Sequence, residues 1–416
     1  MSWRPPDSGG RLATLDLIRG VAVLGILAIN ISGFAGPSLS ALTPDFPTPA
    51  TLPDEAAWAF GFLFFEGKMR ALFAMLFGAG IALQCTRMDA AGQDGDLVQF
   101  RRLCWLMVFG TLHYLLLWWG DILFVYACCG IAVLFLRRLP CAVLLGVAAG
   151  IIVTATVVDL WSMLPLASAE EAVRLGTASA AQHGEVLARL DLYHANTAGQ
   201  MRLYHAGFLD IALSKLRGDP FWLLTMTAHA WSEILPLMLL GVVLLRSGFF
   251  AGDWPAHGMK RLRIGATAIG LCFTVLVLAW AWPRHFPPIA MAMLLGEALW
   301  PAHLLMALGY ASVLVWATPR LIGTRLGLRI LATGRVAFTN YIGTSLLMCG
   351  LFYGWGLNLF GKVGPAGQWA FVLLGWIMML TWSAAWLSRY RRGPLELLWR
   401  CLTLQKRLKN RRSAVV

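Results

Sequence analysis

Residues 11–30 read RLATLDLIRGVAVLGILAIN, an apolar run that contains Asp16, Arg19 and Asn30. A charged side chain inside a membrane span is costly and usually faces a bundle interior or a cavity. Arg19 and Asn30 are eleven residues apart, so a helix places them on nearly the same face, about 16 Å apart along its axis. We therefore expect one face of this helix to border a polar interior. The simpler alternative is an Asp16–Arg19 ion pair that caps and orients the first span.

The composition of the chain indicates an integral membrane protein. Hydrophobic residues make up 58% of the 416 residues, charged residues 13%, and the mean hydropathy is +0.67. A soluble domain has an apolar share of only about 45–50%. The 19 Trp residues are typical of aromatic belts at membrane surfaces. The basic residues are scattered between apolar runs and form no single stripe, which argues against nucleic-acid binding.

The apolar runs predict an all-α, polytopic bundle of ten membrane-spanning helices. We place these near residues 15–34, 57–84, 103–119, 121–136, 141–165, 220–245, 264–283, 286–316, 336–356 and 368–388. Of the 34 Lys and Arg residues, 24 lie before the first span or after every second span, and the opposite short loops hold only Arg284 and Lys362. This bias predicts that both termini are cytoplasmic.

Two segments outside the spans divide the chain into regions. Segment 166–219 mixes charged residues and histidines with Ala and Leu, which predicts two or three amphipathic helices in an extracytoplasmic cap. The cap separates two five-span halves, residues 1–165 and 220–416. The tail, 389–416, contains nine basic residues and one acid, Glu396. It is expected to form an interfacial helix on an anionic inner leaflet.

Several common site types are absent from the sequence. The eight Cys residues all fall in predicted spans or on the cytoplasmic side, so no extracytoplasmic disulfide framework is expected. The chain has no metal-ligand spacing, P-loop or GxSxG motif. A metal site and nucleotide hydrolysis are therefore not predicted.

The second predicted span contains three charged residues, Glu66, Lys68 and Arg70, in the run FFEGKMRALF. Glu66 and Arg70 are four residues apart and can pair along one helix face. One interpretation is a charged wall of a wet cavity inside the membrane. The alternative is a helix that breaks at Gly67 and leaves these charges at the outer water boundary.

The third predicted span places a histidine deep in the membrane. It begins at Arg101 and Arg102, and His113 lies about 16 Å further along the helix. A lone histidine on an apolar face is usually a hydrogen-bonded packing residue. The alternative is a general base or proton relay, because His titrates near neutral pH. Asp121 follows two turns later and is expected to cap the next span. We predict that Arg19, Asn30, Glu66, Lys68, Arg70 and His113 mostly converge on one interior cavity.

Several blocks of sequence are distinctive enough to compare with a known family. They are LDLIRG at 15–20 with Asn30, FEGKMRALFAMLFGAG at 65–80, the 101–127 segment, GRVAFTNY at 334–341 and RYRRGPLELLWRCLT at 389–403. In this order they resemble the YeiB-like bacterial inner-membrane family, whose C-terminal half is a domain of unknown function, 418. Thr344 stands where that pattern leads us to expect Gln.

The first half of the chain is also similar to transmembrane acyltransferases, which move acyl groups from a cytoplasmic donor to an extracytoplasmic sugar. In one branch a His follows the first-span Arg by eleven residues; Asn30 occupies that position here, as in the heparan-glucosaminide acetyltransferase branch. That second branch uses a His in the loop after the first span. Residues 35–57 contain no His, so this role does not transfer.

The resemblance and the buried polar residues lead to an acyltransferase-like hypothesis. The donor would be acyl-CoA, and the acceptor an extracytoplasmic glycan or lipid. The catalytic residues would be His113, Asp121 and Asn30. The substrate-binding residues would be Arg19, Glu66, Lys68 and Arg70. The alternatives are a permease for a small metabolite, with the same charges along its path, and a membrane protein that binds a partner and has no enzymatic activity.

Overall fold

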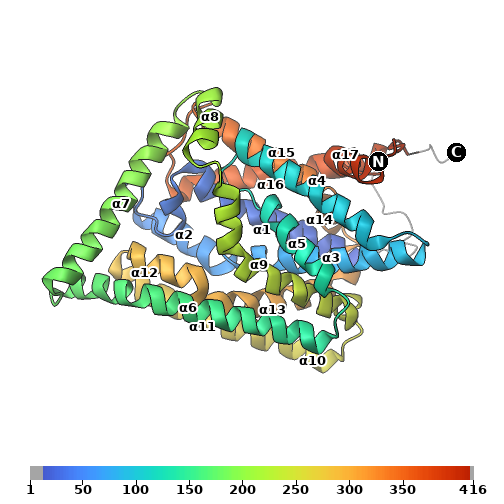
Figure 1. Ribbon diagram of the computed structural model, residues 1–416, viewed down its shortest axis with the longest axis horizontal. Helices are drawn as coiled ribbons and strands as arrows, with labels where there is room; N and C mark the ends of the chain where they lie inside the picture. The colour runs from blue at the N-terminus through green and yellow to red at the C-terminus, as the bar shows by residue number, and fades with distance from the viewer. Residues whose placement is uncertain (1–12, 413–416) are drawn as a thin grey trace.

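The computed structural model describes residues 13–412 as a bundle of α-helices joined mostly by short loops (Figure 1). No β-strand occurs among these residues; two extended segments meet in one bridge between Tyr390 and Arg411. The all-α prediction is confirmed.

The first half of the chain begins with the central helix α1. Its helices are α1 (Ala13–Ala35), α2 (Leu52–Phe64), α3 (Lys68–Ala90), α4 (Gly95–Leu116) and α5 (Leu123–Leu136), with a short 3₁₀ turn at Ser38–Ala41.

The middle of the chain contains three helices, α6 (Cys141–Leu175), α7 (Ala180–Tyr204) and α8 (Phe208–Gly218). The predicted span ends at residue 165, but α6 continues through Pro165 to Leu175. This extension is held by the second half: Glu170 accepts hydrogen bonds from the backbone N–H groups of Ile289 and Ala290. Helix α7 then crosses the end of the molecule opposite α17 (Figure 1). The expected helical composition of segment 166–219 is thus present.

The second half holds the remaining helices. They are α9 (Trp222–Arg246), α10 (Ala256–Arg261), α11 (Thr267–Ala281), α12 (Pro288–Met293), α13 (Trp300–Leu321), α14 (Arg325–Arg335), α15 (Ala337–Phe352), α16 (Pro365–Arg389) and α17 (Pro394–Leu404). Short 3₁₀ turns lie at Phe249–Ala251 and Trp282–Arg284, and π-helical turns at Leu262–Ala266 and Leu294–Ala298.

Within residues 13–412, seven helical segments are long and apolar enough to cross a membrane. They are Ala13–Ala35, Leu52–Ala90, Cys141–Leu175, Trp222–Arg246, Ala256–Arg284, Trp300–Leu321 and Pro365–Arg389. The other three predicted spans correspond to α5 and α15, which are apolar but shorter, and to α4. The protein is therefore a multi-pass membrane protein.

Two helix crossings at the centre of the bundle are unusually close. Helix α3 meets α9 where a Cβ atom on Gly78 would lie 2.0 Å from the carbonyl oxygen of Met238. Helix α1 meets α14 where a Cβ atom on Gly334 would lie 1.8 Å from the carbonyl oxygen of Asp16. Small residues allow such close backbone approach in membrane helices. Because α1 also packs on α3, α15 and α16, the two predicted halves share one core.

The structure corrects two predicted spans and adds one helix that was not predicted. The second span is not one helix: α2 ends at Phe64 and α3 begins at Lys68, with Gly67 at φ 72° between them. The eighth span is divided into α12, a π-helical turn and α13. Helix α14 was not predicted, because its three arginines made the segment look like a charged loop between spans. The helix begins after Thr324, whose side chain accepts a hydrogen bond from the backbone N–H of Gly327.

Candidate functional site

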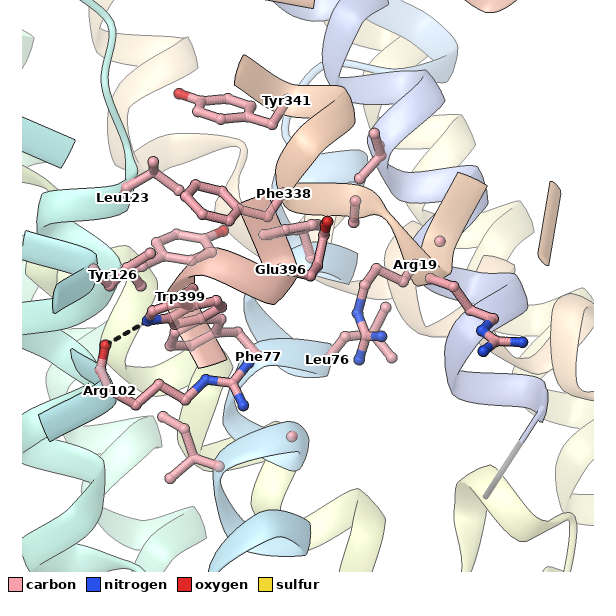
Figure 2. Close-up of a pocket in the computed structure, with 18 of the residues that line it drawn as sticks. Arg19, Leu76, Phe77, Arg102, Leu123, Tyr126, Phe338, Tyr341, Glu396 and Trp399 are labelled. Atoms are coloured by element: carbon pink, nitrogen blue, oxygen red, sulfur yellow. Dashed lines mark hydrogen bonds between the residues drawn. The ribbon is translucent and has the colours of Figure 1, made fainter. Parts of the chain in front are cut away.

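A cavity of about 500 Å³ lies between the two halves of the chain. Its walls come from α1, α3, α4, α5, α14, α15 and the C-terminal segment 391–404. Figure 2 shows side chains from distant parts of the sequence around it, including Arg19, Tyr126, Tyr341 and Glu396. The site therefore forms only when both halves are folded together.

Arginine is the dominant charged residue of this cavity. The lining includes two acids, Asp16 and Glu396, and seven arginines: Arg19, Arg87, Arg102, Arg335, Arg391, Arg392 and Arg400. The guanidinium group presents five donors in a rigid planar fork that matches carboxylate and phosphate oxygens. An anionic ligand with phosphate-like geometry fits this composition.

Arg19 and Asn30 both line the cavity, as the eleven-residue spacing predicts. Since they are about 16 Å apart along α1, the cavity extends over at least that distance. The expected Asp16–Arg19 pair is also present, with the Oδ1 atom of Asp16 3.0 Å from a guanidinium nitrogen. The structure therefore contains both features that the sequence analysis gave as alternatives: Asp16 and Arg19 form an ion pair, and both residues border the cavity.

The part of the lining that includes Asn30 and the aromatic and hydroxyl side chains is neutral. It includes Phe34, Tyr126, Tyr341, Thr344 and Ser345, together with aliphatic side chains of α1 and α3. The cavity therefore presents a strongly basic region and a mainly apolar region with hydroxyl and amide groups. This arrangement suits an amphiphile whose head group is anionic.

The C-terminal segment forms one wall of the cavity. Glu396 accepts hydrogen bonds from the backbone N–H of Thr339, at 3.0 Å, and from its hydroxyl, at 2.6 Å. The Trp399 indole N–H donates to the carbonyl oxygen of Arg102, at 2.8 Å, and the Arg102 guanidinium lies 3.9 Å from the centre of that ring (Figure 2). Burial raises the pKa of the Glu396 carboxyl, and the Thr339 hydrogen bonds oppose this shift. The helix expected in the tail is present as α17, and it packs against α4 and α15.

His113 and Asp121 form a buried pair beside the cavity. The Nδ1 atom of His113 lies 2.8 Å from the Oδ1 atom of Asp121, and both side chains are fully buried. The other carboxylate oxygen accepts from the backbone N–H of Phe124, at 2.9 Å, so Asp121 also caps α5 as predicted. A carboxylate at Nδ1 favours the tautomer that leaves Nε2 as the acceptor nitrogen. Nε2 is buried and has no hydrogen-bond partner among the described residues.

Two aromatic rings separate His113 from the cavity. The ring of Tyr341, which lines the cavity, is 5.0 Å from the His113 ring, centre to centre. Trp118 is 6.5 Å from His113 and stacks on Phe34, another cavity residue, at 4.2 Å. His113 is therefore one layer of side chains away from the neutral part of the cavity.

The charges of the second predicted span form a separate cluster. Arg70 lies 2.9 Å from Glu233 on α9 and 3.5 Å from Glu66, which confirms that Glu66 and Arg70 pair. Lys68 is fully buried and its Nζ atom donates to the carbonyl oxygen of Phe62, at 2.8 Å.

None of these charged groups lines the large cavity. Glu66 borders a separate pocket of about 50 Å³. Of the residues expected to converge, the structure brings only Arg19 and Asn30 into one cavity. It places His113 next to that cavity and keeps Glu66, Lys68 and Arg70 apart.

Most of the basic residues of the cavity were not identified as site residues from the sequence. Four of them served in the sequence analysis only to predict the membrane topology, because loops on the cytoplasmic side are usually rich in Lys and Arg. They are Arg335, Arg391, Arg392 and Arg400. One signal was available: the tail has a lone acid, Glu396, among nine bases, within an apolar run at helical spacing. An acid in that position needs a specific partner, which the structure identifies as Thr339.

The fold and the cavity define a multi-pass α-helical membrane protein with a basic internal cavity. Residues 244–406 match the family described as a protein of unknown function, DUF418. This region supplies α14, α15 and α17, and thus Arg335, Tyr341 and Glu396 of the cavity.

The chain is similar over nearly its whole length to three bacterial proteins. The uncharacterized protein YeiB of Escherichia coli strain K12 is 32% identical over 395 residues, 95% of this chain and 97% of that protein. The uncharacterized protein YxaH of Bacillus subtilis strain 168 is 28% identical, over 97% and 96% of the two chains. An uncharacterized 39.9 kDa protein of Bacillus acidopullulyticus is 26% identical. The chain belongs to the YeiB-like family that contains the DUF418 domain. No solved structure matches it.

Proposed function

We propose that this protein is a membrane-embedded acyltransferase that binds a phosphorylated acyl donor, such as acyl-CoA, in the large cavity. The observation that supports the proposal is the combination of a basic cavity, a neutral region around Asn30 and the adjacent His113–Asp121 pair. The arginines would bind the phosphates of the donor, and the apolar walls would hold its acyl chain.

The His113–Asp121 pair has the arrangement of a general base with its orienting carboxylate. Nε2 of His113 would take the proton of an acceptor hydroxyl while the hydroxyl oxygen attacks the acyl carbon. The thiolate of the donor would leave, and His113 would return the proton to it. Asn30 would donate a hydrogen bond to the oxyanion that develops on the acyl oxygen. The ring of Tyr341 or of Trp118 must move for the acceptor to reach Nε2.

The loop charges support an orientation for this reaction. The basic part of the cavity includes Arg87 in the last turn of α3, Arg102 near the start of α4, and arginines of the C-terminal segment. All of them belong to the side that the charge bias predicts to be cytoplasmic. We therefore place the protein in the bacterial inner membrane with the donor entering from the cytoplasm and a glycan or lipid acceptor on the outer side.

Purified protein in lipid nanodiscs, supplied with labelled acyl-CoA and with glycan or lipid extracts as acceptor, tests the proposal. His113→Ala should lower the rate of label transfer by about 10²–10⁴-fold, the usual effect of losing a general base. His229→Ala is the matched control, because His229 is exposed and its Nδ1 atom contacts only the carbonyl oxygen of Thr225 among the described residues. Equal transfer by wild type and His113→Ala would exclude this role. An absence of transfer, together with metabolite uptake into proteoliposomes, would favour a permease.

A further inference from the structure

Lys215 is a buried lysine in the mostly exposed cap helix α8. The residue is 6% exposed. Its Nζ atom donates to the carbonyl oxygen of Tyr114, at 2.8 Å, and to that of Leu117, at 3.2 Å. Carbonyl groups in the last turn of a helix lack partners within the helix, and a cation there is favoured by the helix dipole. Lys215 therefore binds the C-terminal end of α4.

This turn of α4 is the one that contains His113. The backbone N–H groups of Leu117 and Trp118 both donate to the carbonyl oxygen of His113, at 2.9 and 3.0 Å. Lys215 thus binds one residue next to His113 and another that is hydrogen-bonded to it. A displacement of this turn would move His113 relative to Asp121, which lies beyond the turn in the loop before α5.

The loop between His113 and Asp121 is also held by the region around the cap. The indole N–H of Trp222 donates to the carbonyl oxygen of Trp119, at 3.1 Å. The Tyr114 hydroxyl reaches the carbonyl oxygen of Asp219, at 3.5 Å. The segment that positions the proposed base is therefore bound by residues from the end of the cap to the start of α9.

Burying an ammonium group to dock a helix carries a desolvation penalty. Among the described residues no carboxylate forms a salt bridge with Lys215, and burial lowers the pKa of its ammonium group to about 8. Apolar residues such as Ile211, which is buried on the same helix, dock a helix without the desolvation penalty of a charge. A buried lysine in this place is better explained by a need to fix the last turn of α4.

We propose that Lys215 is a positioning residue for His113, so that the cap controls the geometry of the site on the opposite side of α4. This inference rests on the proposed function for its catalytic consequence. Its structural part, that Lys215 holds His113 in place, can be measured without any substrate.

The first experiment follows the modification of His113 by diethyl pyrocarbonate, residue by residue, with mass spectrometry of the full-length protein in nanodiscs. Lys215→Met should accelerate modification at His113 by about tenfold, the factor that corresponds to the loss of a hydrogen bond from a charged donor. Lys215→Arg, which keeps charged donors, should restore a rate close to that of the wild type. The matched control is Lys362→Met, which removes an exposed lysine. His285, whose side chain is 81% exposed, is the internal reference.

An unchanged rate at His113 in Lys215→Met would overturn the proposal, whether or not the protein transfers acyl groups. If Lys215→Met does not fold, Lys215→Leu replaces it, since leucine also has no hydrogen-bond donor; an unchanged rate in that folded variant has the same meaning. Failure of Lys215→Arg to restore the rate would also contradict the proposal.

The second experiment separates positioning from cap docking. With acyl-CoA as donor, Lys215→Met should lower kcat by about tenfold and leave the KM for the donor unchanged, because Lys215 does not line the cavity. A change in KM alone would refute the positioning role. If the wild type shows no transfer while His113 modification responds as expected, the proposed function fails and the positioning of His113 stands.

Discussion

Two polar regions of this bundle differ in their charge balance. The large cavity is lined by seven arginines and two acids. In the separate cluster near the α2–α3 junction, one arginine, Arg70, contacts two carboxylates, Glu66 and Glu233, and the buried Lys68 lies two residues away. The charges of the cluster cancel when Lys68 is protonated, whereas those of the cavity lining leave an excess of five positive groups.

This difference indicates two uses of charge in one protein. A partly buried group of balanced charges needs no ligand, and its ion pairs fix the helices that contribute to them, here α3 and α9. An excess of arginine around an open volume is expected to recruit an anion. The two regions should therefore respond differently to mutation: the cluster through stability, and the cavity through binding.

The largest effect is expected when the cluster loses its arginine. Arg70→Met leaves Glu66 and Glu233 without their shared cation and should destabilise the protein by about 2–3 kcal/mol; its side chain is 29% exposed, which reduces the penalty. Thermal unfolding in detergent measures this. Arg101→Met, at an exposed position, is the control. Stability equal to the wild type would show that the ion pairs do not hold α3 to α9.

A smaller loss of stability is expected from a change at Gly67, where the chain breaks between α2 and α3. This break positions the residues of the cluster. Gly67 has φ 72°, and a Cβ atom there would lie 2.0 Å from the Nδ1 atom of His303. Gly67→Ala should cost about 2 kcal/mol, since strain and a clash combine. Gly146→Ala is the matched control, because a Cβ atom at that helical position meets nothing within 4 Å. A harmless Gly67→Ala would mean that the break is not structurally required.

The cavity should respond in binding and not in stability. The double variant Arg391→Gln/Arg400→Gln should weaken acyl-CoA binding about tenfold, since charged hydrogen bonds to phosphate are lost. Its unfolding temperature should stay near that of the wild type, because both side chains are exposed. The variant Lys406→Gln/Lys409→Gln has the same change in net charge outside the cavity. If both variants bind equally, the cavity arginines do not recognise the donor.

The smallest effect on stability is expected for an exposed ion pair on the extension of α6. Hydrogen bonds from Arg174, at 2.6–2.7 Å, and the nearby Arg284 guanidinium lower the pKa of Glu171 to about 2. A lowered carboxyl pKa stabilises the fold above its ordinary value near 4.5, and this contribution disappears as the pH falls through about 2. Glu171→Gln should thus be slightly less stable at pH 6 and equal to the wild type at pH 2. A difference that persists at pH 2 would contradict this assignment.

The positions of most apolar helices and the shared face of Arg19 and Asn30 follow from the sequence because they depend on local rules. A run of about 20 apolar residues needs no tertiary partner to be recognised as a span. The helical period then places Arg19 and Asn30 together. The pairing of Glu66 with Arg70 and the capping of α5 by Asp121 are also local, over four and three residues.

The composition of the cavity depends on long-range contacts, and its main elements were not predicted. The tail has the charge and spacing of an interfacial helix, but Glu396 meets Thr339 and Trp399 meets Arg102 only after α4, α15 and α17 have packed together. In the same way, Arg70 has a local partner in Glu66, but its closer partner, Glu233, lies on α9 and is found only in the folded structure.

The sequence by itself therefore determined the class of this protein, its spans and the polar face of its first helix, because hydrophobicity and helical periodicity act within one segment. The tertiary structure decided which polar groups share a cavity and which neutralise each other. A buried charge is stable only with a partner or a solvated cavity, and its partner is set by the packing of helices that are far apart in the chain. His113, Asp121 and Lys215 show this most clearly: a local pair next to the cavity, held by a residue about a hundred positions away.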